Sequence, residues 1–161
     1  MTNYTMRPTG PADQATVAQL VTESWGAPTV VVGHGRVLEP GRLPGLIAEQ
    51  DGEVVGLLTY SVEGTTAELV TFNSFQDGQG IGTALLNAMV ERVRTEGCAR
   101  IILMTTNDNT DAIRYYQRRG FRMRELRVGA VATARASKPE IPLLGNHGIP
   151  ITDELELELT L

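Results

Sequence analysis

At 161 residues, with 42% hydrophobic and 20% charged residues, the chain has the length and composition of one globular domain over residues 1–161. The net charge of −5 gives no general electrostatic reason to bind nucleic acid or an anionic membrane. No apolar run reaches membrane-spanning length, and the sole cysteine, Cys98, cannot form an intrachain disulfide. These features predict a cytoplasmic protein whose partners are neither membranes nor nucleic acids.

The first predicted elements are a strand at residues 3–8 and a helix that Pro11 and Asp13 open and that ends near Trp25. Apolar residues at helical spacing predict that this helix buries one face. Residues 26–45 are rich in Gly and Pro, so they predict a loop-like connection with one short ordered piece around three consecutive valines.

A three-stranded antiparallel meander over residues 43–74 is the clearest predicted unit. Its first two strands flank Asp51 and Gly52, a two-residue turn signal that favours positive φ. A second turn at residues 63–64 leads into the third strand, at residues 66–74. The meander therefore predicts that antiparallel pairing dominates the sheet.

Helices and strands alternate in the next part of the chain. Apolar spacing predicts a helix over residues 82–96, and residues 99–106 form a near-continuous apolar run. Such a run is typical of a central strand that is covered on both faces. A helix is predicted to follow at about residues 110–119, capped by Asn109 or Thr110.

The final part predicts two further strands, at residues 121–128 and 154–161, separated by a less regular segment with an alanine-rich stretch. The last strand alternates, which places four leucines on one face. These are Leu155, Leu157, Leu159 and Leu161. The order of elements predicts an α/β (α+β) fold, a mixed sheet with helices on both faces.

A glycine-rich loop, QDGQGIG, runs into the helix at residues 82–96. Its alternate glycines remove the Cβ atoms that would keep a phosphate from the backbone, and the start of a helix favours anions. A diphosphate could therefore bind the amides of residues 78–83. These are Gly78, Gln79, Gly80, Ile81, Gly82 and Thr83. The loop matches neither GxGxxG nor GxxxxGK[ST], and a flexible loop that only allows tight packing is the alternative.

A second motif, NTDAIRYYQRRGF, begins at Asn109 and by itself indicates a helix with aromatic core residues, Tyr115 above all. Together the two motifs resemble those of the GCN5-related N-acetyltransferase (GNAT) superfamily, and the similarity extends over nearly the whole chain. The glycine motif of that family is [QR]-x-x-G-x-[GA]. Gly80 and Gly82 match it, whereas Asp77 occupies the Gln/Arg position.

The resemblance implies that acetyl-CoA is the cosubstrate and that its pyrophosphate binds the amides of residues 79–83. It implies that the pantetheine arm uses backbone groups near Phe72 and Ser74, where the neighbouring central strand splays away. Asn109 would bond this arm, and Tyr116 would lie beside the thioester sulfur. No metal is expected, because two separated histidines and one cysteine are too few to form a site.

The implied chemistry is direct attack of an amine on the thioester, with the Phe72 amide as donor to the oxyanion. Tyr116 is the candidate general acid, although a buried aromatic that only orients the sulfur is the alternative. Glu68 is the leading candidate base, acting through a water, and a solvated strand glutamate is its alternative. His34 is a second candidate base, and an ordinary loop histidine is its alternative.

Other polar and aromatic residues are given less specific expectations. Trp25 is expected in the core or, as the alternative, in the wall of an acceptor pocket. A basic group is expected on the surface, where some members could meet the CoA 3′-phosphate. It comprises Arg114, Arg118, Arg119, Arg122 and Arg124. An acidic group is expected chiefly on the outer face of the last strand, with attraction of a cationic acceptor as the alternative. It comprises Asp153, Glu154, Glu156 and Glu158. The leucines of the same strand could form a homodimer contact.

The leading functional hypothesis is acetylation of a primary amine on a small molecule. One alternative is acetylation of protein or peptide N-termini, and another is a catalytically silent acyl-CoA-binding regulatory domain. Tyr116 favours an enzyme, and Asp77 favours the silent domain. The irregular segments that would build the acceptor pocket carry no motif that identifies the acceptor.

Overall fold

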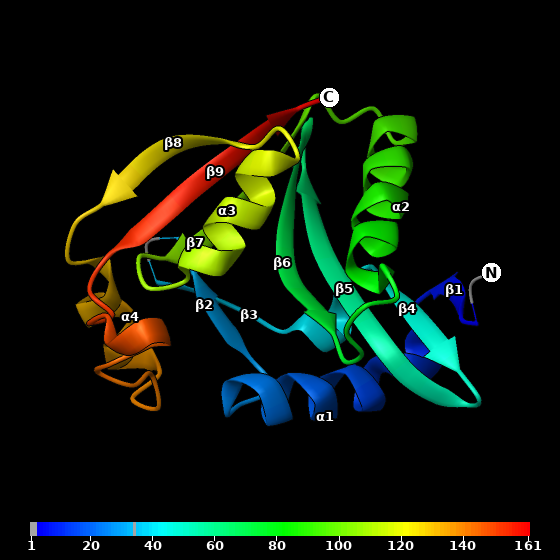
Figure 1. Cartoon of the computed structure of the whole chain (residues 1–161), viewed down its shortest axis with the longest axis horizontal. Helices are drawn as coiled ribbons and strands as arrows, with labels where there is room; N and C mark the ends of the chain where they lie inside the picture. Colours follow the sequence, from blue (N-terminus) through cyan, green and yellow to red (C-terminus); the bar gives the residue numbers. More distant parts are fainter. Residues whose placement is uncertain (1–2, 34) are drawn as a thin grey trace.

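The computed structural model describes residues 3–33 and 35–161. Within them, seven strands form one sheet in the order β1-β4-β5-β6-β7-β9-β8, and β2 and β3 pair separately (Figure 1). The main strands are β1 (Thr5–Pro8), β4 (Gly45–Gln50), β5 (Glu53–Glu63), β6 (Thr66–Ser74), β7 (Arg100–Thr106), β8 (Arg122–Arg127) and β9 (Glu154–Thr160). Only the β6–β7 pair is parallel among these, so the predicted mixed, mostly antiparallel sheet is confirmed.

Helices cover both faces of the sheet, as predicted. On one face α2 (Ile81–Thr95) and α3 (Thr110–Arg118) pack over the larger core cluster. On the other face lie α1 (Gln14–Trp25) and the hairpin of β2 (Val30–Val32) and β3 (Arg36–Leu38). None of the helices in the described residues is long and apolar enough to cross a membrane.

The meander distributes its side chains between these two layers. Leu46 and Leu58 pack in the cluster that contains α2, whereas Ile47 and Leu57 pack in the cluster that contains α1. A Cβ atom at Gly56 of β5 would lie 2.6 Å from Ile81 Cγ2. Glycine at this position therefore lets the first turn of α2 contact the sheet directly, which fixes the end of the glycine-rich loop.

Pairing between β6 and β7 stops partway along the strands. It runs from Thr66 with Arg100 to Leu69 with Leu103, and β6 continues beyond it. Val70 is an extra residue in the β5–β6 ladder at the same level, since Tyr60 faces Leu69 and Thr59 faces Thr71. Because such a bulge bends and twists its strand, it accounts for the divergence of β6 from β7, and the predicted splayed pair is present.

The local predictions were confirmed in some segments and wrong in others. Asp51 and Gly52 both have positive φ, at 52° and 80°, as the turn signal predicted. Residues 26–45 contain a hairpin rather than one ordered piece. The segment after β8 contains a helix, α4 (Ala130–Ser137), which alanine favours and which begins after Gly129 in the left-handed region.

Two further predictions were wrong because they treated each strand alone. Ile101 and Leu103 of β7 are buried, but Ile102 and Met104 on its other face are only half-buried, so that strand is fully covered on one face. The leucines of β9 pack against the larger core cluster, with Leu157 fully buried. They are not an exposed dimer contact, and a homodimer stays a prediction without that support.

An ion pair near the N-terminus makes stability depend on pH. Asp13 accepts hydrogen bonds of 2.8 Å from Arg7 and from the Gly10 amide, and these contacts lower the pKa of Asp13 to about 2. The ionised form is therefore favoured on folding, and its contribution is present above pH 4 and lost as the pH falls through about 2.

We expect Asp13→Asn to lower the melting temperature at pH 6, because Arg7 loses one of its two charged partners and keeps only Glu49. The difference from wild type should shrink on acidification to pH 2.5, where the wild-type carboxylate begins to protonate. Thermal melts at both pH values measure this. A difference of the same size at both values would show that the ion pair does not contribute.

Candidate functional site

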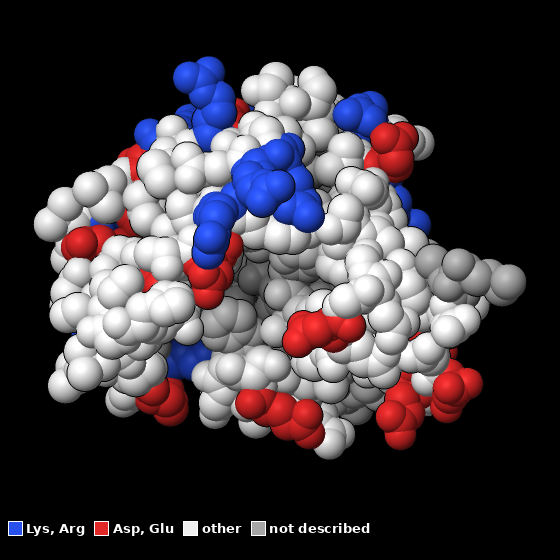
Figure 2. Space-filling view, viewed as in Figure 1, with Lys and Arg blue, Asp and Glu red and all other residues white. Residues whose placement is uncertain are grey.

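A cavity of about 580 Å³ opens where β6 and β7 diverge, and α2 and α3 contribute to its wall. The space-filling view shows this face of the molecule as hollowed (Figure 2). Of the residues predicted to bind the cofactor or act in catalysis, five line the cavity. They are Phe72, Ser74, Gly82, Asn109 and Tyr116. The other residues predicted to bind the diphosphate are not in the cavity lining; they precede or begin α2, next to Gly82.

The glycine-rich loop adopts the backbone that its sequence favours. Gly78 and Gly80 have φ of 80° and 70°, in the left-handed region, and α2 begins directly after Gly80. The first hydrogen bond of α2 runs from the Ala84 amide to the Gly80 carbonyl oxygen. The amides of the residues before Ala84 therefore have no acceptor within the helix. The loop therefore combines available N–H groups with the positive end of a helix dipole, which suits a diphosphate.

We expect Gly80→Ala to weaken acetyl-CoA binding about tenfold, because a Cβ disfavours the left-handed backbone by about 1–2 kcal/mol. Gly52 offers a matched control, since its φ is 80° and, as at Gly80, a Cβ would meet no atom within 4 Å. Gly52→Ala should lower stability but leave the dissociation constant unchanged. Calorimetric titration measures the acetyl-CoA affinity of both variants. An affinity of Gly80→Ala equal to that of wild type would argue against a diphosphate at this loop.

Tyr116 lies in an aromatic cluster at the floor of the cavity. Its side chain is 8% exposed, and its ring lies 5.5 Å from Tyr115, 5.4 Å from Phe121 and 6.2 Å from Phe72, measured between ring centroids. Burial, with a smaller effect of Tyr115, raises the pKa of the Tyr116 phenol above its ordinary value. The phenol therefore stays protonated at neutral pH and can donate a proton.

Tyr115 has a second role beyond the core packing that the sequence predicted for it. It lines the cavity, and its hydroxyl lies 3.1 Å from Thr83 Oγ1 in the first turn of α2. Arg119 stacks 3.5 Å from the centroid of the Tyr115 ring and donates to the same Thr83 oxygen. Adjacent residues on a helix point about 100° apart, so one of the two tyrosines is directed toward the side of the helix, a signal that could have located this contact.

The predicted basic group divides between two surfaces. Arg114, Arg118 and Arg119 surround a depression on α3, visible as a basic patch beside the hollow in Figure 2. Arg124 instead reaches beneath the sheet, where its nitrogens lie 3.5 Å from Glu156 and 3.6 Å from Glu158. Only the α3 part of the group is therefore placed to meet an anion near the cavity.

Two cavity residues differ from the roles the sequence assigned them, and a third, Asp77, is placed by the structure. Trp25 is 46% exposed and lines the cavity, so the core position favoured for it was wrong. Asn109 precedes α3, but neither its side chain nor that of Thr110 caps the helix. Instead, the side-chain Nδ2 of Asn109 donates to Thr105 Oγ1 at 3.2 Å. Asp77 is exposed and lines the cavity.

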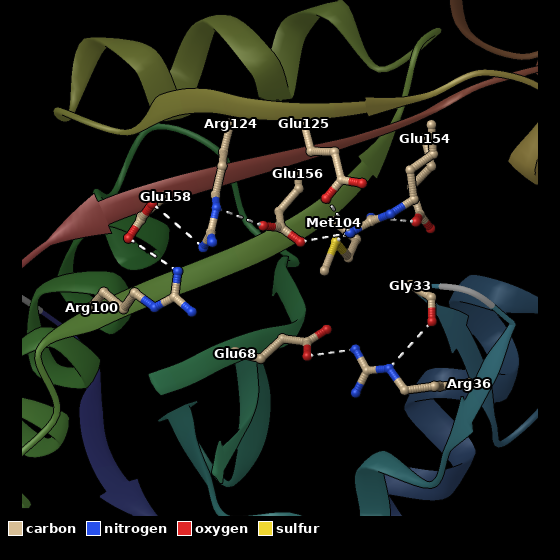
Figure 3. Close-up of polar contacts among 11 residues, drawn as sticks. Gly33, Arg36, Glu68, Arg100, Met104, Arg124, Glu125, Glu154, Glu156 and Glu158 are labelled. Carbon is tan, nitrogen blue, oxygen red and sulfur yellow. Dashed lines mark hydrogen bonds and ion pairs between the residues drawn. The ribbon is translucent and has the colours of Figure 1, made fainter. Parts of the chain in front are cut away.

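Glu68 lies on the opposite face of the sheet from Tyr116. It is 6% exposed, so the alternative of a solvated glutamate was wrong. Arg36 donates to its Oε1 at 2.8 Å, and Figure 3 shows the two side chains pointing toward each other. The Oε2 atom is buried, and no donor in the described part of the protein reaches it. His34, the second candidate base, lies outside the described residues.

The Glu68–Arg36 pair lies behind the cavity wall rather than in it. Val70, two residues after Glu68 on β6, lines the cavity, and so does Met104 of β7. A Cβ atom at Gly33 would lie 3.2 Å from Arg36 Nη2 and 3.4 Å from Met104 Cε. The guanidinium group therefore lies beside the side chain that forms this part of the wall.

The glutamates of the last strand are paired with arginines, which does not support the alternative that they attract a cationic acceptor. Glu156 is buried, and Arg127 donates to it at 2.8 Å and to Glu154 at 2.9 Å. Figure 3 shows Glu154, Glu156 and Glu158 along the same strand. Arg100 lies 3.3 Å from Glu158. Because arginines from neighbouring strands neutralise these glutamates, this face has little charge left with which to attract a cation.

Comparisons with known proteins agree with this architecture. Residues 14–121 match the profile of the Acetyltransferase (GNAT) family. The chain is 41% identical over 151 residues to the uncharacterized protein YxbD of Bacillus subtilis, covering 93% of this chain and 94% of that protein. An IAA acetyltransferase from Bacillus cereus aligns with a TM-score of 0.73, 21% identity and coverage of 98% and 99% of the two chains. A GNAT family acetyltransferase from Elizabethkingia anophelis with acetyl-CoA bound aligns over 100% of both chains, with a TM-score of 0.69 and 18% identity.

Proposed function

The chain belongs to the Acetyltransferase (GNAT) family, and from that premise we propose that it transfers the acetyl group of acetyl-CoA to a primary amine on a small molecule. One observation carries the proposal. The sheet opens beyond Leu69 and Leu103 into a cavity that lies between the glycine-rich loop and the buried phenol of Tyr116. This arrangement suits a long thioester whose diphosphate and reacting carbon must be held at separate points.

The residues present fit acetyl-CoA. The left-handed glycines 78 and 80 leave the amides of residues 78–83 accessible to a diphosphate, with Arg119 already bonded to Thr83 at the same turn. Beyond Leu69, the edge of β6 that includes Phe72 and Ser74 is not paired with β7 and can bond the pantetheine amides. Asn109 is available from the opposite wall. Acetyl-CoA bound here supplies an activated acetyl thioester.

The chemistry divides among three groups of this chain. The Phe72 amide is the proposed donor to the oxyanion that forms when the amine attacks. Tyr116 gives its proton to the departing thiolate and regains one from solvent. Glu68 is the proposed acceptor of the amine proton. It lies four residues before Phe72, about 13 Å along an extended strand, so the proton has to travel through a chain of waters.

The cavity also bears on the size of the acceptor. Its volume of about 580 Å³ has to hold both the acetyl end of the cosubstrate and the acceptor, which favours a small molecule over a folded protein surface. Trp25, Val70 and Met104 give it an apolar and aromatic side. We propose that the acceptor amine is attached to a group that packs against this side.

Calorimetric titration with acetyl-CoA, followed by a CoA-release assay, tests the proposal. The assay panel should contain amino acids, arylalkylamines, polyamines and short peptides with free N-termini. We expect micromolar binding and turnover of at least one small amine. Turnover confined to peptides would favour the N-terminal acetyltransferase. Binding without any turnover would favour a silent acyl-CoA-binding domain, and no binding would refute the proposal.

A further inference from the structure

We propose that Arg36 is a positioning residue that holds one carboxylate oxygen of Glu68 and so presents the other, Oε2, to the proton of the acceptor amine. The inference rests on the proposed acetyl transfer. It adds a residue that belongs to neither motif and that lies outside the main sheet, on the β2–β3 hairpin. Arg36 would act through Glu68 and would not touch the acetyl group.

The contacts divide the two oxygens of Glu68 between different roles. Arg36 Nη2 donates to Oε1 at 2.8 Å, while Arg36 Nε lies 3.3 Å from the Gly33 carbonyl oxygen, so the guanidinium is held at two points (Figure 3). Oε2 is buried and receives no hydrogen bond from the described protein groups. A buried carboxylate oxygen needs a proton donor, and a water that carries the amine proton would meet this need.

The hairpin that carries Arg36 is a firm support. Arg36 pairs with Val32 in the two-stranded sheet, and Val32 and Val30 are buried in the core cluster that contains α1. The side chain of Arg36 is nevertheless 45% exposed, in contrast to 7% for Glu68. The backbone of Arg36 is therefore held by a packed hairpin, its side chain is partly exposed, and the carboxylate that it contacts is buried.

Other arginines on this face of the sheet already have their own partners. Arg127 contacts Glu125, Glu154 and Glu156, and Arg124 contacts Glu156 and Glu158. Arg100 contacts Glu158. Glu158 lies on β9, two strands away from β6, at the same level of the sheet as Glu68. Within the described residues, Arg36 is the cation that is paired with Glu68. The pair is thus separate from the larger ion-pair network of β8 and β9.

The proton step balances with groups that are already named. The acceptor enters as an ammonium ion, and the first water of a chain takes one ammonium proton while the last water of that chain gives one of its own protons to Oε2. Glu68 becomes neutral, the amine becomes a nucleophile, and the waters are regenerated. Arg36 stays on Oε1 throughout, so the carboxylate cannot rotate and turn Oε2 away from the water.

A double-mutant cycle tests the assignment on the panel amine that the wild type acetylates fastest. We expect Arg36→Met to lower kcat about 100-fold, since small misplacements of a catalytic group cost about that much, with unchanged acetyl-CoA affinity. Arg36→Lys should recover most of the activity. In a Glu68→Gln background, measured near pH 10, Arg36→Met should have no further effect.

Arg42→Met is the matched control, because Arg42 is a nearby arginine with a 70% exposed side chain that pairs with Glu39. It should leave kcat unchanged, and thermal melts of all variants identify any loss of folding. Unchanged kcat in Arg36→Met, or an equal loss with and without Glu68, would overturn the inference while acetyl transfer stands. Absence of wild-type turnover on the whole panel would instead refute the proposed function, and this inference with it.

Discussion

Glu68→Gln is expected to reduce kcat/KM for acetyl transfer by about 10²–10⁴-fold at pH 7, the usual contribution of a general base. Glutamine keeps the size of the side chain and can still accept a bond from Arg36, but it cannot take the proton of an ammonium ion. Glu68 is buried beside a single arginine, four residues before Phe72 on β6. Steady-state kinetics on the best panel amine measure the effect.

The pH dependence separates a base from a structural residue in this variant. A neutral amine needs no base, so the deficit should shrink as the pH approaches about 10, near the pKa of an ordinary alkylamine. Glu156→Gln is a useful comparison, because Glu156 is also a buried glutamate paired with arginine, but on β9. A deficit in Glu68→Gln that stays constant with pH would contradict proton transfer and indicate only lost packing.

Tyr116→Phe is expected to lower kcat by about 10²-fold, the lower end of the usual contribution of a general acid, and to leave acetyl-CoA binding nearly unchanged, since general acids contribute mainly to the transition state. Burial raises the pKa of this phenol, so it stays protonated between pH 7 and pH 9. The kcat of the wild type should therefore not fall in this range through deprotonation of Tyr116. Stopped-flow release of CoA and calorimetry measure the two quantities separately.

Tyr60→Phe provides the same chemical change at a tyrosine that is 1% exposed and is absent from the wall of the cavity. Its hydroxyl contacts Arg92 at 3.5 Å, so its removal should affect stability more than turnover. Equal turnover in Tyr116→Phe and wild type would remove the acid role and leave Tyr116 as an aromatic that shapes the cavity floor.

The sequence predicted those parts of the fold that short-range patterns determine. The turn at Asp51 and Gly52, the helix after the glycine-rich loop and the alternation of the last strand depend on neighbours within a few residues. The splay between β6 and β7 was expected only from the resemblance to a family. Nothing near Val70 in the sequence marks the bulge that bends the strand.

The parts that could not be predicted depend on contacts between distant residues. Arg36 and Glu68 are 32 residues apart, and neither carries a local signal that it pairs with the other. The strands of the β2–β3 hairpin have three residues each, too few to show a period. The sequence left two positions open for Trp25, the core or the wall of an acceptor pocket, and the favoured one was wrong, since its position at the end of α1 leaves it at the cavity wall.

The position of β9 determines how the sheet can assemble on the ribosome. β9 lies between β7 and β8, although both of those strands precede it in the chain, and β8 joins the main sheet through β9 (Figure 1). Residues 122–127 therefore leave the ribosome well before the strand that they pair with. During that interval residues 122–127 have no partner strand, and the arginines of this segment, whose apolar Met123 and Leu126 stay exposed even in the folded protein, work against pairing with other chains.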